Sequence, residues 1–138
     1  MGKTSDFQDG RHAVFNLHVH LVFVTIYRRK VFDSANLDDL QNIFNKVCSD
    51  YEAERVEFDG EEDHVHLLMH YPRNITISNL VNRLKGASNR LIRSRNYPSI
   101  RRKIWGTSLW SPSYFAGSYG GALISIIQQY IEQQNTPD

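Results

Sequence analysis

The sequence is poor in cysteine and in long apolar runs, and each shortage excludes a class of protein. Its single cysteine, Cys48, excludes a disulfide framework and a cysteine-rich zinc site. No apolar stretch approaches the roughly 20 residues that a membrane-spanning helix needs, and the polar N-terminal residues 1–10 contain no signal-peptide core. The chain has 138 residues, 41% hydrophobic and 22% charged, which is typical of a globular protein. We therefore expect one domain over residues 1–138, located in the cytoplasm.

Acidic residues are missing from a long stretch of the second half. The formal net charge is +1, but residues 1–63 hold 7 Lys+Arg and 13 Asp+Glu (net −6), and residues 64–138 hold 9 and 2 (net +7). There is no acidic residue from His64 to Ile131. Such asymmetry is expected of a face that binds a polyanion, and equally of a solvated basic surface.

Hydrophobic periodicity predicts alternating strands and helices. The segments expected as strands are 14–26, 56–59, 64–71 and, as strand or extended chain, 108–118; the expected helices are 36–54, 77–95 and 122–134. The dipeptide Asp59-Gly60 is expected to supply a hairpin turn, and a loop is expected around Pro98. The order β-α-β-β-α-β-α predicts an α/β (α+β) protein with an antiparallel sheet, helices on one of its faces, and a split β-α-β arrangement.

The tripeptide His-Val-His occurs twice, at His18/His20 and at His64/His66. Residues two apart on a strand point to the same side, so either pair could hold one metal ion, although structural histidines give the same pattern. The second pair is the better candidate because it lies beside Asp63 at the mouth of a hairpin and begins the acid-free half. The first pair, midway along an apolar strand, fits a core or a supporting role.

The predicted C-terminal helix contains Tyr130 and Gln134, four residues apart and hence on one surface. By itself, this pattern also fits an exposed tyrosine on a glutamine-rich helix. Three parts of the sequence form a recognisable set: the segment Asp63-His64-Val65-His66-Leu67-Leu68, the stretch 110–115 leading to Gly120-Gly121-Ala122, and the ending Gln129-Tyr130-Ile131-Glu132 with Gln134. Together they resemble the single-tyrosine HUH transposases of insertion sequences, the TnpA-like enzymes. Segments 22–31 and 85–90 match as well, so the resemblance covers nearly the whole chain. One departure is Val19 before His20, where that family commonly has an aromatic residue.

The resemblance implies an HUH-type, ferredoxin-like fold and a strand transferase that acts on single-stranded or hairpin DNA at transposon ends. It implies that Tyr130 is the nucleophile and that His64, His66 and Gln134 hold Mg²⁺ or Mn²⁺. Nitrogen ligands favour Mn²⁺, and zinc is a third option. It further implies a homodimer, with Tyr130 meeting the histidines of its own or of the partner chain, and no membrane or small-molecule substrate.

The basic residues are then expected to contact DNA phosphates: Arg28, Arg29, Arg83, Lys85, Arg90 and Arg93, with further cations at 95 and 101–103. Aromatic residues 105, 110, 114 and 115 are expected either to stack on unpaired bases or to belong to the core. The pair Gly120-Gly121 is interpreted as a hinge before the tyrosine helix, or as a simple helix-start turn.

Two other function classes fit parts of the sequence. A non-catalytic nucleic-acid-binding module would need only the basic half, and a histidine-ligated metal hydrolase would need no covalent step. Cleavage by Tyr130→Phe without a protein–DNA adduct would exclude the transposase, and a wild type that binds DNA but never cuts with Mg²⁺ or Mn²⁺ would identify the binding module.

Overall fold

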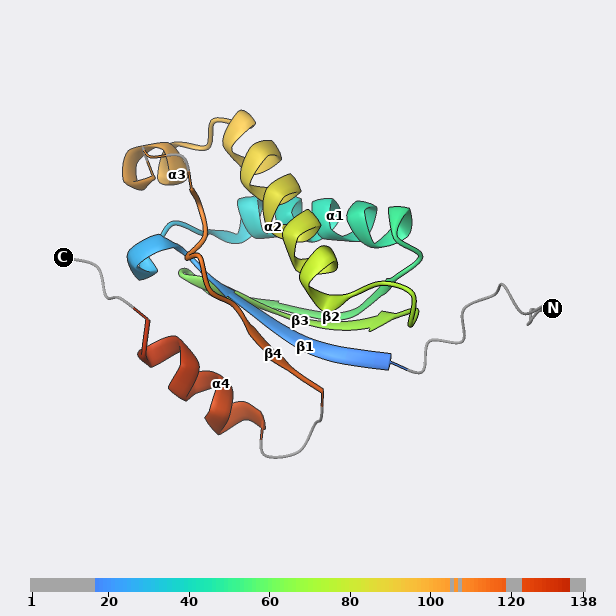
Figure 1. Cartoon of the computed structure of the whole chain (residues 1–138). Helices are drawn as coiled ribbons and strands as arrows, with labels where there is room; N and C mark the ends of the chain where they lie inside the picture. The colour runs from blue at the N-terminus through green and yellow to red at the C-terminus, as the bar shows by residue number, and fades with distance from the viewer. Residues whose placement is uncertain (1–16, 105, 107, 119–122, 135–138) are drawn as a thin grey trace.

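A four-stranded antiparallel sheet forms the centre of the protein, with helices on both of its sides (Figure 1). The structure is a computed structural model that describes residues 17–104, 106, 108–118 and 123–134. Its elements are β1 (Leu17–Val24), the 3-10 helix η1 (Ile26–Arg28), α1 (Ser34–Asp50), β2 (Glu54–Gly60), β3 (His64–Tyr71), α2 (Ile77–Ser94), α3 (Pro98–Lys103), β4 (Phe115–Gly117) and α4 (Leu123–Glu132). No helix in these ranges is long and apolar enough to cross a membrane. The α+β class agrees with the sequence prediction, and the element order does so apart from the short η1 and the additional helix α3.

The register of the two central strands places both histidine motifs on one face of the sheet. The strand order is β2-β3-β1-β4, so β1 and β3 are neighbours. In their antiparallel pairing, Val24 lies opposite His64, Val22 opposite His66, and His18 opposite His70. Because side chains alternate along a strand, these pairs all project from the same side.

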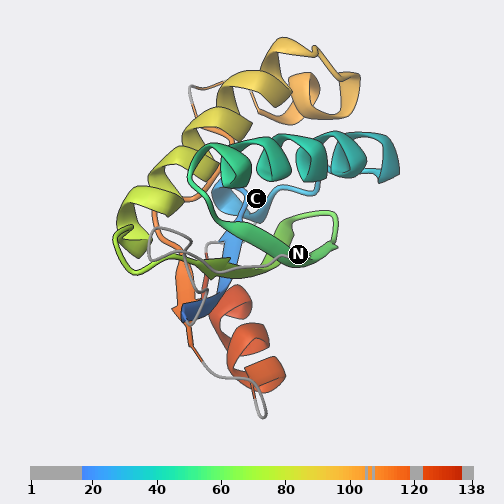
Figure 2. The same ribbon diagram turned by 90° about the vertical axis from the view of Figure 1, so that its right-hand side faces the viewer.

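The opposite face of the sheet carries the main hydrophobic core under α1 and α2 (Figure 2). Strand β1 contributes Val19, Leu21 and Phe23, and β3 contributes the apolar residues that alternate with its histidines. Trp110 lies in this core, 2% exposed, with its indole N–H donating to Ser88 Oγ at 2.9 Å. It belongs to the core and is not a platform for bases.

Helix α4 covers the histidine-bearing face, so the prediction that the helices share one face is wrong. Ile127 and Ile131 of α4 pack on Val22 and Val24 of β1 in a small second cluster. The physical reason is that β1 is apolar on both faces near its end, and each apolar face needs a cover. Period-2 alternation alone does not reveal that need.

The boundaries of α1 are fixed by capping. Asp33 is the N-cap, its side chain accepting from the Asn36 N–H while the Asn36 side chain accepts from the Asp33 N–H. The helix ends at Asp50, four residues before the predicted end, because Glu52 adopts a left-handed backbone (φ 55°) that turns the chain into β2. Strand β2 then begins at Glu54.

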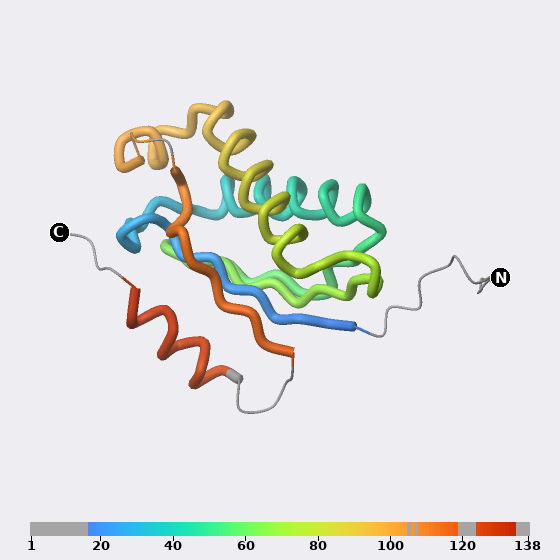
Figure 3. The backbone as a smooth tube through the Cα atoms, in the orientation of Figure 1, coloured from blue at the N-terminus to red at the C-terminus, as the bar shows by residue number. Residues whose placement is uncertain are grey.

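Three other boundaries differ from prediction. Pro98 begins α3 where a loop was expected, since proline fits the first turn of a helix. Asp59 and Gly60 lie in β2, and the turn uses residues 61–63, closed by a hydrogen bond from the Glu61 N–H to the His64 carbonyl (2.9 Å). Regular pairing in segment 108–118 is limited to β4 and one bridge between Trp110 and Thr25, although Figure 3 shows this orange segment following β1 closely.

Candidate active site

A cavity of about 510 Å³ opens between the histidine-bearing face of the sheet and α4. His64 and His66 of β3 line it together with an acidic rim and one side of α4. The remaining lining residues are Lys30, Asp59, Glu61, Glu62, Asp63, Ile124, Ile127, Gln128 and Ile131. His64 and His66 share a face, as their i, i+2 spacing predicted, and both line an open space large enough for a ligand.

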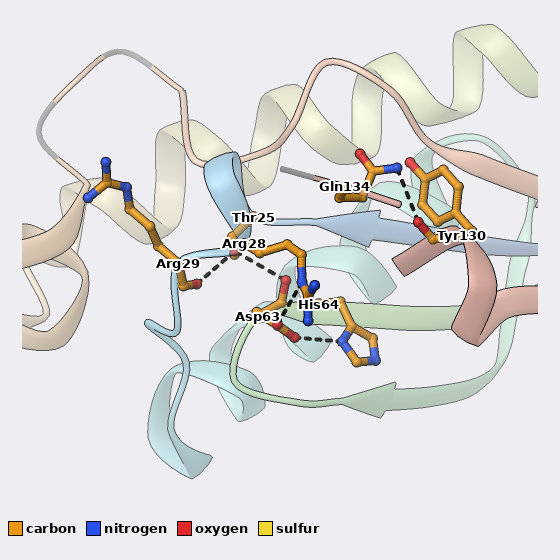
Figure 4. Close-up of polar contacts among 7 residues, drawn as sticks. All are labelled: Thr25, Arg28, Arg29, Asp63, His64, Tyr130 and Gln134. Carbon is orange, nitrogen blue, oxygen red and sulfur yellow. Dashed lines mark hydrogen bonds and ion pairs between the residues drawn. The ribbon is translucent and has the colours of Figure 1, made fainter. Parts of the chain in front are cut away.

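His64 is held by a carboxylate that precedes it in the chain. Asp63 Oδ1 lies 2.8 Å from His64 Nδ1, and Asp63 Oδ2 lies 3.5 Å from Arg28 Nε (Figure 4). The pKa of Asp63 is lowered, first by the hydrogen bond from His64 and then by the charges of His64 and Arg28, against the opposing effect of burial. Asp63 is therefore an anion at neutral pH, although it is only 8% exposed.

His66 contacts a histidine of the first motif. His20 Nδ1 lies 2.9 Å from His66 Nε2, and the two rings are stacked with their centroids 5.2 Å apart. Burial lowers the pKa of both imidazoles, so both are neutral near pH 7 and retain nitrogen lone pairs. His20 thus supports the neighbouring site, whereas His18 lies farther along the strand beside His70, which pairs with Glu54.

Tyr130 of α4 and Gln134, two residues beyond the end of that helix, lie together, as their four-residue spacing predicted, but on the side that faces β4. The Tyr130 hydroxyl is 2.8 Å from Ser113 Oγ, and its ring centroid is 5.8 Å from that of Phe115. Gln134 Oε1 accepts from Ser111 Oγ at 3.3 Å and from Ser113 Oγ at 3.1 Å. Burial raises the pKa of the Tyr130 phenol despite the opposing hydrogen bond with Ser113.

The cavity side of α4 presents Gln128 and three isoleucines, so neither Tyr130 nor Gln134 is among the residues that line the histidine cavity. Figure 4 shows the same separation, with Tyr130 and Gln134 apart from Asp63 and His64. Within a single chain, His64 and His66 therefore lie together, and Tyr130 and Gln134 lie together, but the two pairs do not meet. The predicted hinge, Gly120-Gly121, lies outside the described residues.

The donor atoms of the cavity fit a divalent cation in part. Two imidazoles from one strand face are common ligands of Zn²⁺ and of other divalent transition metals. In the described part of the chain, however, no three His, Cys, Asp or Glu side chains converge into a metal-binding group. A metal at His64 and His66 therefore requires a ligand of another type, such as an amide oxygen, or an oxygen of the substrate.

The predicted DNA-contacting residues occupy different surfaces. Arg83 and Arg90 are exposed on α2, with the Arg83 guanidinium 5.7 Å from the Tyr51 ring centroid. Arg93 donates to the Gly106 carbonyl, and Arg29 lies over the Tyr27 ring at 5.5 Å. Arg28 lies at the rim of the site beside Asp63. Their contacts with DNA remain predictions.

Lys85 has an internal role that its charge did not suggest. Its ammonium donates to the carbonyls of Ser111 (2.6 Å) and Ser113 (3.2 Å), and burial lowers its pKa. Lys85 therefore ties α2 to the segment that receives Tyr130 and Gln134.

Sequence reasoning did not assign three residues of the site: Arg28 as the partner of Asp63, Gln128 as a lining residue, and His20 as the partner of His66. Strand parity could have placed His20 on the correct face. The pairing register, which brings it to His66, has no local signal in the sequence.

Comparison with known proteins identifies the family. The model of the family "Transposase IS200 like" matches residues 13–134. The ISDra2 transposase TnpA of Deinococcus radiodurans is 33% identical over 130 residues, covering 94% of this chain and 92% of the relative. The transposase of insertion sequence IS200 from Salmonella typhimurium is 27% identical, covering 92% and 82% of the two chains.

Solved structures agree with this result. A crystal structure from Deinococcus radiodurans, described as a candidate transposase, superposes with a TM-score of 0.83 at 34% identity and covers 95% of this chain and all of that one. A REP-associated tyrosine transposase bound to a REP hairpin shares the fold, with a TM-score of 0.57 at 12% identity, covering 92% of this chain and 69% of that one. The matched family model and the relatives span nearly the whole chain, and the chain therefore belongs to the IS200-like family of transposases.

Proposed function

We propose that this chain nicks and rejoins single-stranded DNA at the ends of an insertion element, using Tyr130 as a covalent nucleophile and a divalent metal at His64 and His66. The observation that carries the proposal is the cavity in which the imidazoles of His64 and His66 face α4, the helix that bears Tyr130. The ISDra2 relative is named as a transposase, and the REP-associated fold neighbour was solved with a DNA hairpin. We infer the same class of substrate here, processed in the cytoplasm by one catalytic domain.

In the proposed reaction the Tyr130 oxygen attacks a backbone phosphorus, and the bond from that phosphorus to the 3′-oxygen breaks. The phenol proton passes to solvent, the departing oxygen takes up a proton from solvent and leaves as a 3′-hydroxyl, and the 5′ side remains attached as a phosphotyrosine. Attack by a second strand's 3′-hydroxyl then restores the phosphodiester and frees Tyr130. The covalent bond conserves the energy of the phosphodiester, so no nucleotide cofactor is consumed.

A phenol with a pKa raised by burial is a poor nucleophile at neutral pH, so the site must assist both attack and departure. A bound Mg²⁺ or Mn²⁺ would polarise the scissile phosphate and stabilise the leaving oxygen. His64 and His66 would hold the ion, with Gln134 as the third protein ligand. Because these three ligands are uncharged, the ion would keep its full charge for the phosphate.

We further propose that two copies of the chain assemble, and that α4 of one copy completes the cavity of the other. In one chain Tyr130 and Gln134 face Ser113, while Gln128 and isoleucines face the histidines. In the described structure α4 docks on the sheet through the small cluster of Val22, Val24, Ile127 and Ile131, with Phe115 and Tyr130 packed against it, and we infer that a contact of this size can be exchanged between copies.

The test mixes two inactive variants on a single-stranded substrate with Mg²⁺ or Mn²⁺. Tyr130→Phe and His64→Ala are each expected to bind a hairpin and to leave it uncut, whereas wild type forms a protein–DNA adduct on a denaturing gel. If α4 acts between copies, the co-folded mixture regains cleavage.

Cleavage by Tyr130→Phe without an adduct would refute the covalent mechanism. A wild-type chain that binds DNA and never cuts with either metal would instead identify a binding module. Failure of the mixture alone, with wild type active, would place Tyr130 and the histidines of one chain in the same site.

A further inference from the structure

Asp63 occupies a position between the proposed metal site and the turn that follows β1. It directly precedes β3, and its side chain turns back toward the first residue of that strand, His64. Asp63 Oδ1 is 2.8 Å from His64 Nδ1 (Figure 4). The carboxylate is largely buried, its side chain 11% exposed, and the imidazole is 19% exposed.

The main chain of Asp63 is anchored independently of this contact. Its carbonyl accepts from the Thr25 N–H at 2.9 Å and from the Thr25 hydroxyl at 3.1 Å. Thr25 is fully buried, and its hydroxyl also lies 2.7 Å from the Arg29 carbonyl. These contacts fix the backbone of Asp63 to the turn after β1, at a position from which its side chain reaches His64.

The second carboxylate oxygen is also occupied. Asp63 Oδ2 lies 3.5 Å from Arg28 Nε, a buried atom with no hydrogen-bond partner among the described residues. Arg28 and the preceding Tyr27 both have left-handed backbones (φ 54° and 55°), an unusual conformation that directs Arg28 toward the carboxylate. With one oxygen facing His64 and the other facing Arg28, Asp63 is placed to orient a ligand rather than to be one.

A neutral imidazole carries one N–H and one lone pair, and a carboxylate can only accept a hydrogen bond. Asp63 therefore requires the proton of neutral His64 to reside on Nδ1, which leaves the Nε2 lone pair for a metal. His66 has a different partner: the neutral His20 ring can either donate or accept, so it does not select one form of His66. Of these two imidazoles, only His64 has its tautomer set by its partner.

We propose that Asp63, supported by Arg28, is the positioning residue for the metal ligand His64: it fixes the tautomer and the ring orientation in which His64 Nε2 can bind the ion. This inference rests on the proposed metal site. It follows the general behaviour of metal-bound histidines, whose second nitrogen donates to a carboxylate or a carbonyl.

The experiment compares Asp63→Asn with Glu61→Gln in the full chain. Both replacements remove one negative charge from the rim of the same cavity, but the Glu61 side chain is exposed, and among the described contacts Glu61 touches His64 only through its backbone N–H, which the replacement keeps. Mn²⁺ binding is titrated by electron paramagnetic resonance of the free ion, without DNA. We expect Asp63→Asn to weaken Mn²⁺ binding about 10- to 100-fold, the usual effect of removing such a partner, and Glu61→Gln to change it far less.

A second readout is the ¹⁵N spectrum of His64 in the metal-free protein at a pH where the ring is neutral. Wild type is expected to show the proton on Nδ1, and Asp63→Asn a mixture of tautomers, because an amide can donate as well as accept. Hairpin binding and thermal unfolding check that the fold is intact.

Equal Mn²⁺ affinity in the two variants, or a wild-type His64 protonated on Nε2, would overturn the role of Asp63 while leaving the metal site standing. A wild-type chain that binds no Mn²⁺ would refute the proposed metal site and this inference with it. If Asp63→Asn does not fold, Arg28→Gln loosens the carboxylate indirectly; weaker Mn²⁺ binding supports the proposal, and unchanged binding contradicts it.

Discussion

Replacement of Ile131 by alanine tests whether α4 is held separately from the rest of the protein. Ile131 is 8% exposed and belongs to the four-residue cluster of Val22, Val24, Ile127 and Ile131, which is distinct from the main core. Loss of a buried isoleucine side chain costs about 2–5 kcal/mol. The lower end applies because the neighbouring cavity admits water at the site of the deletion.

A loss of about 2 kcal/mol corresponds to a roughly 30-fold larger open population of α4, since about 1.4 kcal/mol is a tenfold change. Amide hydrogen exchange, measured by mass spectrometry under conditions where the opening equilibrium sets the rate, should accelerate by that factor in peptides from α4. Peptides from β3 should keep their protection, because the main core is untouched.

The matched control is Ile92→Ala, which removes the same side chain from the main core, where Ile92 is fully buried. It should lower protection throughout the protein. If Ile131→Ala lowers the protection of β3 as much as that of α4, the helix unfolds only with the whole domain. The proposed exchange of α4 between copies would then lack its physical basis.

Two further predictions concern groups whose environment departs from what their chemistry suggests. Lys85→Met should destabilise the chain by about 1–3 kcal/mol in urea unfolding, because two carbonyls lose a charged donor, and should leave the salt dependence of hairpin binding unchanged. Arg90→Ala is an exposed control on the same helix, and if Arg90 contacts a phosphate it should reduce the slope of log binding constant against log salt concentration by about 1. A reduced slope for Lys85→Met would contradict the internal role of Lys85. Burial raises the pKa of the Cys48 thiol to about 12, whereas a thiol in the unfolded chain ionises near ~8.5. Above about pH 8.5 the unfolded state therefore binds fewer protons than the folded state, and the free energy of unfolding should fall by up to about 1.4 kcal/mol per pH unit. Cys48→Ala should flatten this alkaline slope in urea titrations between pH 8 and 10, and an unchanged slope would assign it to other groups.

Much of the site could be predicted because its chemistry is local. Residues two apart on a strand share a face, so His64 and His66 had to project together, and the four-residue spacing of Tyr130 and Gln134 had to join them on one side of a helix. The acid-free second half and the matching motifs pointed to the transposase family, which the comparisons confirmed.

What the sequence could not supply is the relation between segments far apart in the chain. The antiparallel register of β1 and β3 decides that His20 meets His66, and the turn after β1 decides that Arg28 meets Asp63. The sequence by itself determined which side chains share a face, because backbone periodicity is a local property. Only the tertiary structure decided that α4 covers the histidine-bearing face and turns Tyr130 toward Ser113, because the docking of a helix depends on apolar surfaces from distant parts of the chain.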